Sequence, residues 1–411
     1  MSAARAAENG RYSFAAALSE HPVTADAVGE VVGEVLERLN PTASGGSLPP
    51  PPDLALLFVT PAHMNNVGAA AAAVRAALEP RTLLGCAAVS IVGGGREVER
   101  GPGVSLWAGY TGALTPFHLT VAATPDGQTF TGWPDDIPED PSALLLLADP
   151  FTFPADQLLV RLGEDRPGLP VVGGLASAAR GPGDNRLILD GEVLAQGAVG
   201  VFLGPEVTVS TVVSQGCRPV GNPFVVTKAD RNVVYELAGR PALERLQEVA
   251  EALSEEDRAL MSDLVQLGQV IDEGKAEFSR GDFLIRNVVG ADPASGALAI
   301  AGEVDVGSTT QFQVRDADSA DEDLRQLVDG QSADGALLFT CNGRGIRLFG
   351  SPNHDAGVVS ESLAGAPIAG MFCAGELGPI GGHNFLHGFT ASVVLLSVDT
   401  ENVPTAGNRL I

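Results

Sequence analysis

The turn at residues 340–345, with the sequence TCNGRG, places a thiol, an amide and a guanidinium close together. Arg344 can donate paired hydrogen bonds to a carboxylate or a phosphate, and its charge would favour the thiolate form of Cys341. Glycines let a ligand approach the main chain. We predict that this turn contacts a ligand through Cys341, Asn342, Gly343, Arg344 and Gly345. The alternative is a tight structural turn in which the thiol is buried and the arginine pairs with a local acid.

A second polar segment, GELGPIGGHNFLHG at residues 375–388, follows some thirty residues later. Glu376 is flanked by small residues, so its carboxylate could hold a ligand amine or pair with Arg344. We predict that this segment contributes Gly375, Glu376, His383, Asn384 and His387 to the same ligand site.

Three kinds of site fit these residue types. His383 and His387 have the HxxxH spacing of zinc ligands on a helix, but glycines surround them and no HExxH motif is present. A cysteine hydrolase would need Cys341 beside one of these histidines, oriented by Asn384 or Glu376. The third possibility is a polar pocket that binds a small molecule without converting it. No phosphate-binding glycine motif occurs, so nucleotide binding is not supported.

The elements that must position these residues follow one plan, repeated three times. Apolar runs at 54–59, 143–148 and 335–340 have strand length, and each leads through a helical stretch to a second apolar run containing glycine. The spacing from strand start to glycine is 31, 30 and 34 residues, which suits a βαβ unit of about 30 residues. A third apolar run follows each unit, at 104–109, 198–204 and 391–398. The pattern indicates an internal repeat.

The three repeats differ in the turn after the first strand. The first two turns contain Pro61 and Pro150, which suit rigid turns, whereas the third has two glycines, a thiol and a guanidinium. We therefore expect the site in the third repeat. We also expect Arg344→Ala and Glu376→Ala to abolish ligand binding without changing the melting temperature.

The predicted fold class is α/β, with two lobes of mixed sheets built from βαβ units and antiparallel hairpins. We expect an N-terminal domain at 1–238 and a C-terminal domain at 239–411, with the ligand in the cleft between them. Residues 11–39 have the apolar spacing of a helix. Residues 41–52, PTASGGSLPPPP, indicate a surface loop.

Composition excludes several classes of partner. The net charge of −26 disfavours nucleic acid and anionic membrane surfaces. No apolar run approaches the roughly 20 residues that span a bilayer, and the N-terminus has no signal-peptide core. The four cysteines are widely spaced, which indicates free thiols in a reducing compartment. We therefore expect a cytoplasmic protein that neither binds nucleic acid nor inserts into a membrane.

Several segments together resemble the FIST family, a two-part sensory module of bacterial signalling proteins. The N-terminal part is similar through PDLALLFVTPAH (52–63), LLGCAAVSIVGGG (83–95), PVVGGLAS (170–177) and GAVGVFLG (197–204). The junction is similar through QGCRPVGNPFVVTKADRNVVYELAGRPALERL (215–246), and the C-terminal part through FTCNGRGIRLFG (339–350) and PIAGMFCAGELGPIGGHNFLHGFTA (367–391). The resemblance implies a FIST N-terminal and a FIST C-terminal domain, and a role in sensing small ligands such as amino acids. It supplies no catalytic residues, and the chain leaves no room for a kinase, methyl-accepting or F-box segment.

Together these observations predict a small-molecule-binding module for signal transduction, with no catalytic residue, no metal and no cofactor. The ligand would be an amino acid or a similar small polar metabolite. Arg344 would meet its carboxylate and Glu376 its amine. Two alternatives remain: a cysteine-dependent hydrolase or redox sensor using Cys341, and an interaction scaffold. Any signalling protein partner is unknown.

Overall fold

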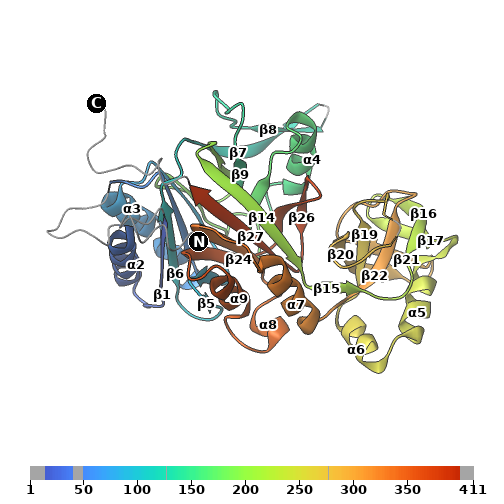
Figure 1. Ribbon diagram of the computed structural model, residues 1–411. Helices are drawn as coiled ribbons and strands as arrows, with labels where there is room; N and C mark the ends of the chain where they lie inside the picture. The colour runs from blue at the N-terminus through green and yellow to red at the C-terminus, as the bar shows by residue number, and fades with distance from the viewer. Residues whose placement is uncertain (1–13, 40–49, 126, 276, 399–411) are drawn as a thin grey trace. The chain divides into compact units, whose positions relative to one another are not determined.

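The computed structural model describes residues 14–39, 50–125, 127–275 and 277–398 (Figure 1). The chain divides into two compact units. Unit 1 contains the described residues up to Val213, then 325–386, and the residues from Thr390 onward. Unit 2 contains residues 214–324 and 387–389. Most of the predicted loop at 41–52 lies outside the described residues.

Unit 1 contains three mixed sheets, each with one parallel strand pair at its centre. The first has the strand order β1 (Phe14–Ser19), β6 (Val104–Gly109), β2 (Leu54–Val59), β3 (Thr82–Ala87), β11 (Leu187–Leu189), β12 (Glu192–Leu194). The second has the order β8 (Gly127–Thr131), β7 (Leu114–Thr124), β13 (Ala198–Leu203), β9 (Ala143–Ala148), β10 (Val171–Leu175), β25 (Glu376–Ile380), β26 (His383–His387). The third has the order β14 (Val207–Gln215), β27 (Thr390–Val398), β23 (Gly335–Cys341), β24 (Ile368–Cys373), β4 (Ile91–Gly93), β5 (Arg96–Val98).

The predicted threefold repeat is confirmed by the strand register. The pairs β2–β3, β9–β10 and β23–β24 are parallel, and β6, β13 and β27 pair antiparallel with the first strand of each unit. The three glycines that mark the second strands stand opposite equivalent leucines: Gly85 opposite Leu57, Gly173 opposite Leu146 and Gly370 opposite Leu338. At each glycine an added Cβ would collide with the carbonyl oxygen of that leucine. The three repeats therefore share one backbone geometry.

Each repeat gives one hairpin to the sheet of another repeat, and the exchange closes in a cycle. The β11–β12 hairpin of the second repeat extends the first sheet, β25–β26 of the third extends the second, and β4–β5 of the first extends the third. An equivalent backbone hydrogen bond joins each exchanged hairpin to the second strand of the repeat that receives it. Ala87 N–H donates to Arg186 O at 2.9 Å, Leu175 N–H to Gly375 O at 2.8 Å and Phe372 N–H to Ser90 O at 2.9 Å. A side chain of one repeat can therefore reach the site of another.

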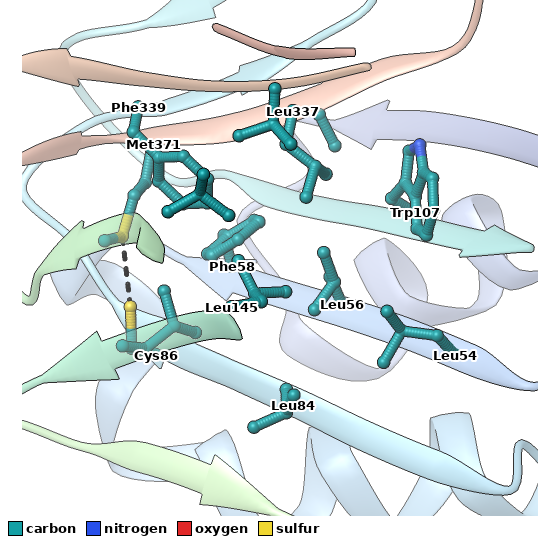
Figure 2. Packing of buried hydrophobic residues seen from close by; sticks show 14 of the residues in the cluster. Leu54, Leu56, Phe58, Leu84, Cys86, Trp107, Leu145, Leu337, Phe339 and Met371 are labelled. Atoms are coloured by element: carbon teal, nitrogen blue, oxygen red, sulfur yellow. Dashed lines mark hydrogen bonds between the residues drawn. The ribbon is translucent and has the colours of Figure 1, made fainter. Parts of the chain in front are cut away.

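The inner faces of the three sheets share one hydrophobic core. Figure 2 shows apolar side chains of the first sheet, among them Leu56 and Phe58, packed with Leu145 of the second and with Leu337 and Phe339 of the third. In the same view the Cys86 thiol lies 3.1 Å from the sulfur of Met371. Burial of this apolar surface is the main force that holds the three sheets together.

Helices cover the outer faces or join the strands. Helices α2 (Thr24–Leu39) and α3 (Val67–Leu78) pack on the first sheet, and α4 (Ala155–Asp165) packs on the second. The 3₁₀ turn η1 (Pro61–Asn66) precedes α3. In the third repeat, α7 (Ala317–Val328) precedes β23, and α8 (Ile346–Phe349) and α9 (His354–Ser362) form the crossover between β23 and β24. Within the described ranges, no helix has the length and apolar character needed to cross a membrane.

In the described part of the chain, unit 2 is a small β-barrel with two complete helices and residues 317–324 of α7. Its strands are β15 (Cys217–Pro219), β16 (Phe224–Asp230), β17 (Val233–Leu237), β18 (Arg240–Pro241), β19 (Gln266–Val270), β20 (Phe283–Asp292), β21 (Ala297–Ile300) and β22 (Thr309–Arg315). The sheet closes because β19 pairs with both β20 and β22. Helices α5 (Ala242–Ala252) and α6 (Glu255–Asp263) contribute to its separate core. Ser254 caps α6 as its sequence suggests, accepting a hydrogen bond from Asp257 N–H at 3.0 Å.

The structure confirms a two-part α/β protein with mixed sheets and corrects one prediction of secondary structure. The helix expected over 11–39 begins only at Thr24, because residues 14–19 form strand β1. The alanine-rich sequence FAAALS favours a helix by propensity, but pairing with β6 overrides that preference. The division into domains at residue 238 remains a prediction. The compact units are discontinuous in sequence, since unit 2 lies within the third repeat, between β14 and β23.

Candidate functional site

The candidate site lies at the carboxyl ends of β23 and β24, in unit 1. Cys341 ends β23 and stands directly opposite Cys373, which ends β24. The turn after β23 closes with a hydrogen bond from Arg344 N–H to Cys341 O at 2.9 Å. His63 N–H makes the same bond to Thr60 O at 3.0 Å in the first repeat, as Thr152 N–H does to Asp149 O at 3.4 Å in the second. The three turns are therefore equivalent, with histidine, threonine and arginine at the same position.

Arg344 is fully buried and pairs with Asp355 of helix α9. Its Nε and Nη2 donate to the two Asp355 oxygens at 2.7 and 2.8 Å, which is the paired geometry that a guanidinium favours. Thr340 Oγ1 also donates to Asp355, at 2.6 Å. Burial would raise the pKa of Asp355, but the Arg344 charge and these hydrogen bonds outweigh it and lower that pKa. Among the residues that the structure describes, Arg344 Nη1 has no hydrogen-bond partner.

Glu376 begins β25 and is also fully buried. Its Oε2 accepts hydrogen bonds from Thr390 N–H at 3.2 Å and Thr390 Oγ1 at 2.9 Å. Burial raises the pKa of Glu376 to about 8, although Thr390, the Arg344 charge and a hydrogen bond with Cys341 all oppose the rise. Within the described part of the chain, Glu376 Oε1 has no partner. At neutral pH this side chain is therefore mainly a carboxylic acid, able to donate a proton.

Two more acids reach this region from the β4–β5 hairpin of the first repeat. Glu97 accepts from Ala356 N–H at 2.9 Å, and burial together with the Asp355 charge raises its pKa to about 7. Both oxygens of Glu99 accept from Ile346 N–H, at 2.9 and 3.0 Å, at the start of α8. Gly345 has a φ of +62°, and an added Cβ there would collide with the Glu99 carboxylate. The acids of one repeat and the turn of another thus form one polar cluster.

Aromatic rings lie beside the buried arginine. The Arg344 guanidinium carbon lies 5.2 Å from the centre of the Phe349 ring, within range of a cation–π contact. The His354 ring stacks on Phe349, and its Nδ1 lies 3.0 Å from Asp355 Oδ1. These contacts hold the guanidinium in a fixed orientation.

Two further predicted residues, His383 and Asn384, lie on strand β26. Asn384 braces the backbone before β10, since its Oδ1 accepts from Val171 N–H at 2.8 Å and its Nδ2 donates to Leu169 O at 2.7 Å. Asn384 therefore does not orient a histidine ring, which is the role that a cysteine hydrolase would require of it. His383 is exposed, and strand β26 separates it from His387 by about 13 Å, too far for one zinc ion. The HxxxH interpretation assumed a helix.

Sequence reasoning missed Asp355, Glu97, Glu99 and Thr390. Asp355 lies near Arg344 in sequence, in SPNHDAG, and an aspartate in the first turn of a helix was a signal that could have been followed. The two glutamates could not be found in this way, because Glu99 contacts a residue 247 positions later in the chain.

Comparison with known proteins identifies two family domains in the chain. The FIST N domain matches residues 53–240, and the FIST C domain matches residues 242–379. The uncharacterized protein Rv0628c of Mycobacterium tuberculosis is 45% identical over 378 residues, covering 90% of this chain and 97% of that protein. The uncharacterized protein Mb0898c of Mycobacterium bovis is 47% identical over 357 residues, covering 85% of this chain and 92% of that protein. With both domains matched in order and these relatives similar over most of their length, the chain belongs to the FIST family of sensory, ligand-binding domains.

Proposed function

We propose that this chain senses a small polar metabolite, in the first instance an amino acid, through the cluster around Arg344 and Glu376. One observation carries the proposal. Of the nine buried side-chain polar atoms that have no hydrogen-bond partner in the described chain, three belong to this cluster: Arg344 Nη1, Glu376 Oε1 and Glu97 Oε2. Leaving such an atom unsatisfied costs about 1–3 kcal/mol, and more for charged groups, so the gathering of three of them at one place needs a reason. A ligand that bonds to Arg344 and Glu376 supplies one.

The position of the cluster supports the same proposal. Ligands of α/β sheets gather at the carboxyl ends of parallel strands, where Cys341 and Cys373 lie. The other two repeats do not reproduce the cluster. By register, Ile91 and Leu187 occupy the positions equivalent to Glu376, and both are apolar. A carboxyl group thus replaces an aliphatic side chain in one repeat out of three.

The burial of Arg344 and Glu376 limits both the route by which a ligand can enter and the atoms that it can contact. Asp355 already occupies Nε and Nη2 of Arg344, so only Nη1 is left for a ligand carboxylate. Both Arg344 and Glu376 are closed to solvent, whereas Asn342 of the same turn is exposed. We therefore propose that the turn at 342–345 opens to admit the ligand, with Cys341, Gly343, Gly345 and Gly375 around it.

The pKa of Glu376 gives the proposal a test that is specific for an amine. A ligand ammonium would stabilise the ionised carboxylate, so binding below pH 8 must release a proton from Glu376. Calorimetric titration at pH 7 in two buffers of different ionisation enthalpy should then show close to one proton released per ligand. A ligand that binds without proton release would contradict contact between an amine and Glu376.

Thermal-shift screening of the amino acids identifies the ligand class. An amino acid at 100 times its dissociation constant should stabilise the protein by about 2.7 kcal/mol. Glu376→Gln, which keeps the shape of the side chain, should remove most of that shift. Glu37→Gln, at an exposed position on α2, is the matched control and should keep it. If no amino acid or small carboxylic acid stabilises the wild-type protein, the proposal fails.

Three further parts of the proposal concern the setting of the protein. We propose that it acts by binding and not by catalysis, in line with a family of sensory domains. We also propose a cytoplasmic location and a signalling protein as the downstream partner. Pull-down from cells with wild-type and Glu376→Gln protein, with and without ligand, would test that partner. A pure scaffold would bind the same proteins in every case.

A further inference from the structure

Cys341 and Cys373 are the last residues of two neighbouring parallel strands and stand directly opposite each other. Residues so paired have Cα atoms about 4.8 Å apart, within the range of about 4.4–6.8 Å that a disulfide spans. Side chains of opposed residues point to the same face of a sheet. Cys373 and Phe339, which lies two residues before Cys341, both face the shared core, so both thiols lie on that inner face.

The two thiols differ in environment. Cys373 is completely buried, and burial followed by the charge of Glu376 raises its pKa well above the ordinary value. Cys341 retains 6% exposure, is followed by the exposed Asn342, and shares a hydrogen bond with Glu376. Gly343 N–H also points to its sulfur, at 3.5 Å. Of the pair, Cys341 is therefore the one that an oxidant reaches first.

We infer that Cys341 and Cys373 form a reversible disulfide when the protein meets a peroxide. The Cys341 sulfur attacks hydrogen peroxide, and the thiol proton joins the departing hydroxide, which gives a sulfenic acid and one water. The Cys373 sulfur then displaces hydroxide from the sulfenic acid, which leaves as a second water with the Cys373 proton. Two thiols lose two electrons in total, and the peroxide gains them. A small dithiol reverses the change by exchange.

The disulfide would alter the polar cluster beside it. Cys341 would no longer donate a hydrogen bond to Glu376, which is one of the contacts that lower the pKa of that carboxyl. The ends of β23 and β24 would also be tied together at the turn that carries Arg344. This inference does not depend on the identity of any ligand.

Thiol counting and peptide mapping of the full-length protein test the inference. After treatment with hydrogen peroxide, quenching and unfolding, the number of reactive thiols should fall from four to two. Mapping without reductant should find one linked pair of peptides, which contain Cys341 and Cys373, and dithiothreitol should restore all four thiols. Four thiols after treatment, or a link that joins any other pair or two molecules, would overturn the inference.

Two variants separate the steps. Cys373→Ala removes the resolving thiol, so the sulfenic acid at Cys341 should persist and be captured by dimedone. Cys86→Ala removes a third buried thiol that faces the same core, and it should still lose two thiols on oxidation. Capture at another cysteine in Cys373→Ala would contradict the assignment of Cys341 as the attacked thiol. Because the mapping uses wild-type protein, the test does not depend on whether either variant folds.

Discussion

Arg344 and Asp355 carry opposite charges that are both buried, so each side chain needs the other to compensate its charge. Sequence analysis assigned Arg344 to a ligand and expected its removal to leave the fold unchanged. The structure shows a guanidinium with no exposed surface and two bonds to Asp355. A buried charge that loses its partner is costly, so the arginine supports the fold whatever else it binds.

Arg344→Ala should therefore lower the free energy of unfolding by about 3–5 kcal/mol, because Asp355 would remain buried and unpaired. Urea denaturation measures the loss. Arg347→Ala, at an exposed position three residues later, is the matched control and should change stability by less than about 0.5 kcal/mol. A loss below about 1 kcal/mol for Arg344→Ala would mean that Asp355 finds another partner or becomes protonated.

Glu376 should make stability depend on pH in a defined direction. Its folded pKa of about 8 lies above the ordinary value of 4.5, so the folded state holds a proton that the unfolded state releases between these values. Its contribution to stability is complete below pH 4.5 and is lost as the pH rises through 8. Each pKa unit corresponds to about 1.4 kcal/mol, so the effect amounts to a few kcal/mol.

Glu376→Gln carries no titrating proton at this position. The stability of the variant relative to wild type should rise steadily between pH 4.5 and 8, as measured by urea denaturation across that range. Glu37→Gln should show a constant difference. A difference that does not change with pH for Glu376→Gln would show that the carboxyl group is ionised in the folded protein at all these values.

At the scale of elements, three strands depend on glycine for the same reason. Gly85, Gly173 and Gly370 each bring a second strand against the carbonyl oxygen of a leucine on the first. A side chain there cannot be accommodated by rotation, since the obstacle is backbone. The hydrophobic runs of these strands determine where each strand forms, and the glycine determines how its partner can approach.

Gly370→Ala should destabilise the protein by several kcal/mol, because β24 must shift away from β23 to accept the methyl group. Gly85→Ala and Gly173→Ala should behave alike if the repeats are equivalent. Gly33→Ala is the control: it lies within α2, where nothing surrounds the new methyl group, and it should stabilise the protein by about 0.5–1 kcal/mol. Thermal or urea unfolding of the four variants measures these changes in stability. Equal effects at 33 and 370 would contradict the proposed close approach.

At the scale of the whole molecule, the three repeats form one unit because each completes the sheet of another. Isolated, a repeat would leave the edge of its second strand without the hairpin that covers it. The barrel of unit 2 interrupts the third repeat between β14 and β23 and keeps a core of its own. The polar cluster therefore draws on residues 97–99, 340–355, 376 and 390 of unit 1, while the segment between 214 and 324 forms another body.

The sequence by itself determined the three βαβ units, their order and the glycines within them. These features are local, because apolar runs and the length of a crossover are set within about thirty residues. It also placed the reactive side chains in the third repeat, where the structure finds a buried thiol, guanidinium and carboxyl group.

Only the tertiary structure decided which partners those side chains have. Glu97 and Glu99 join the cluster through a hairpin exchanged between the first and third repeats, a contact that no local spacing encodes. Burial, which sequence reasoning underestimated for Arg344 and Glu376, arises when three sheets close on one core. The same burial raises the pKa of Glu376 and leaves its Oε1 and Arg344 Nη1 without partners in the described chain. The sequence determines which ionisable side chains are present. Their burial, which shifts their pKa values, is decided only when the sheets pack together.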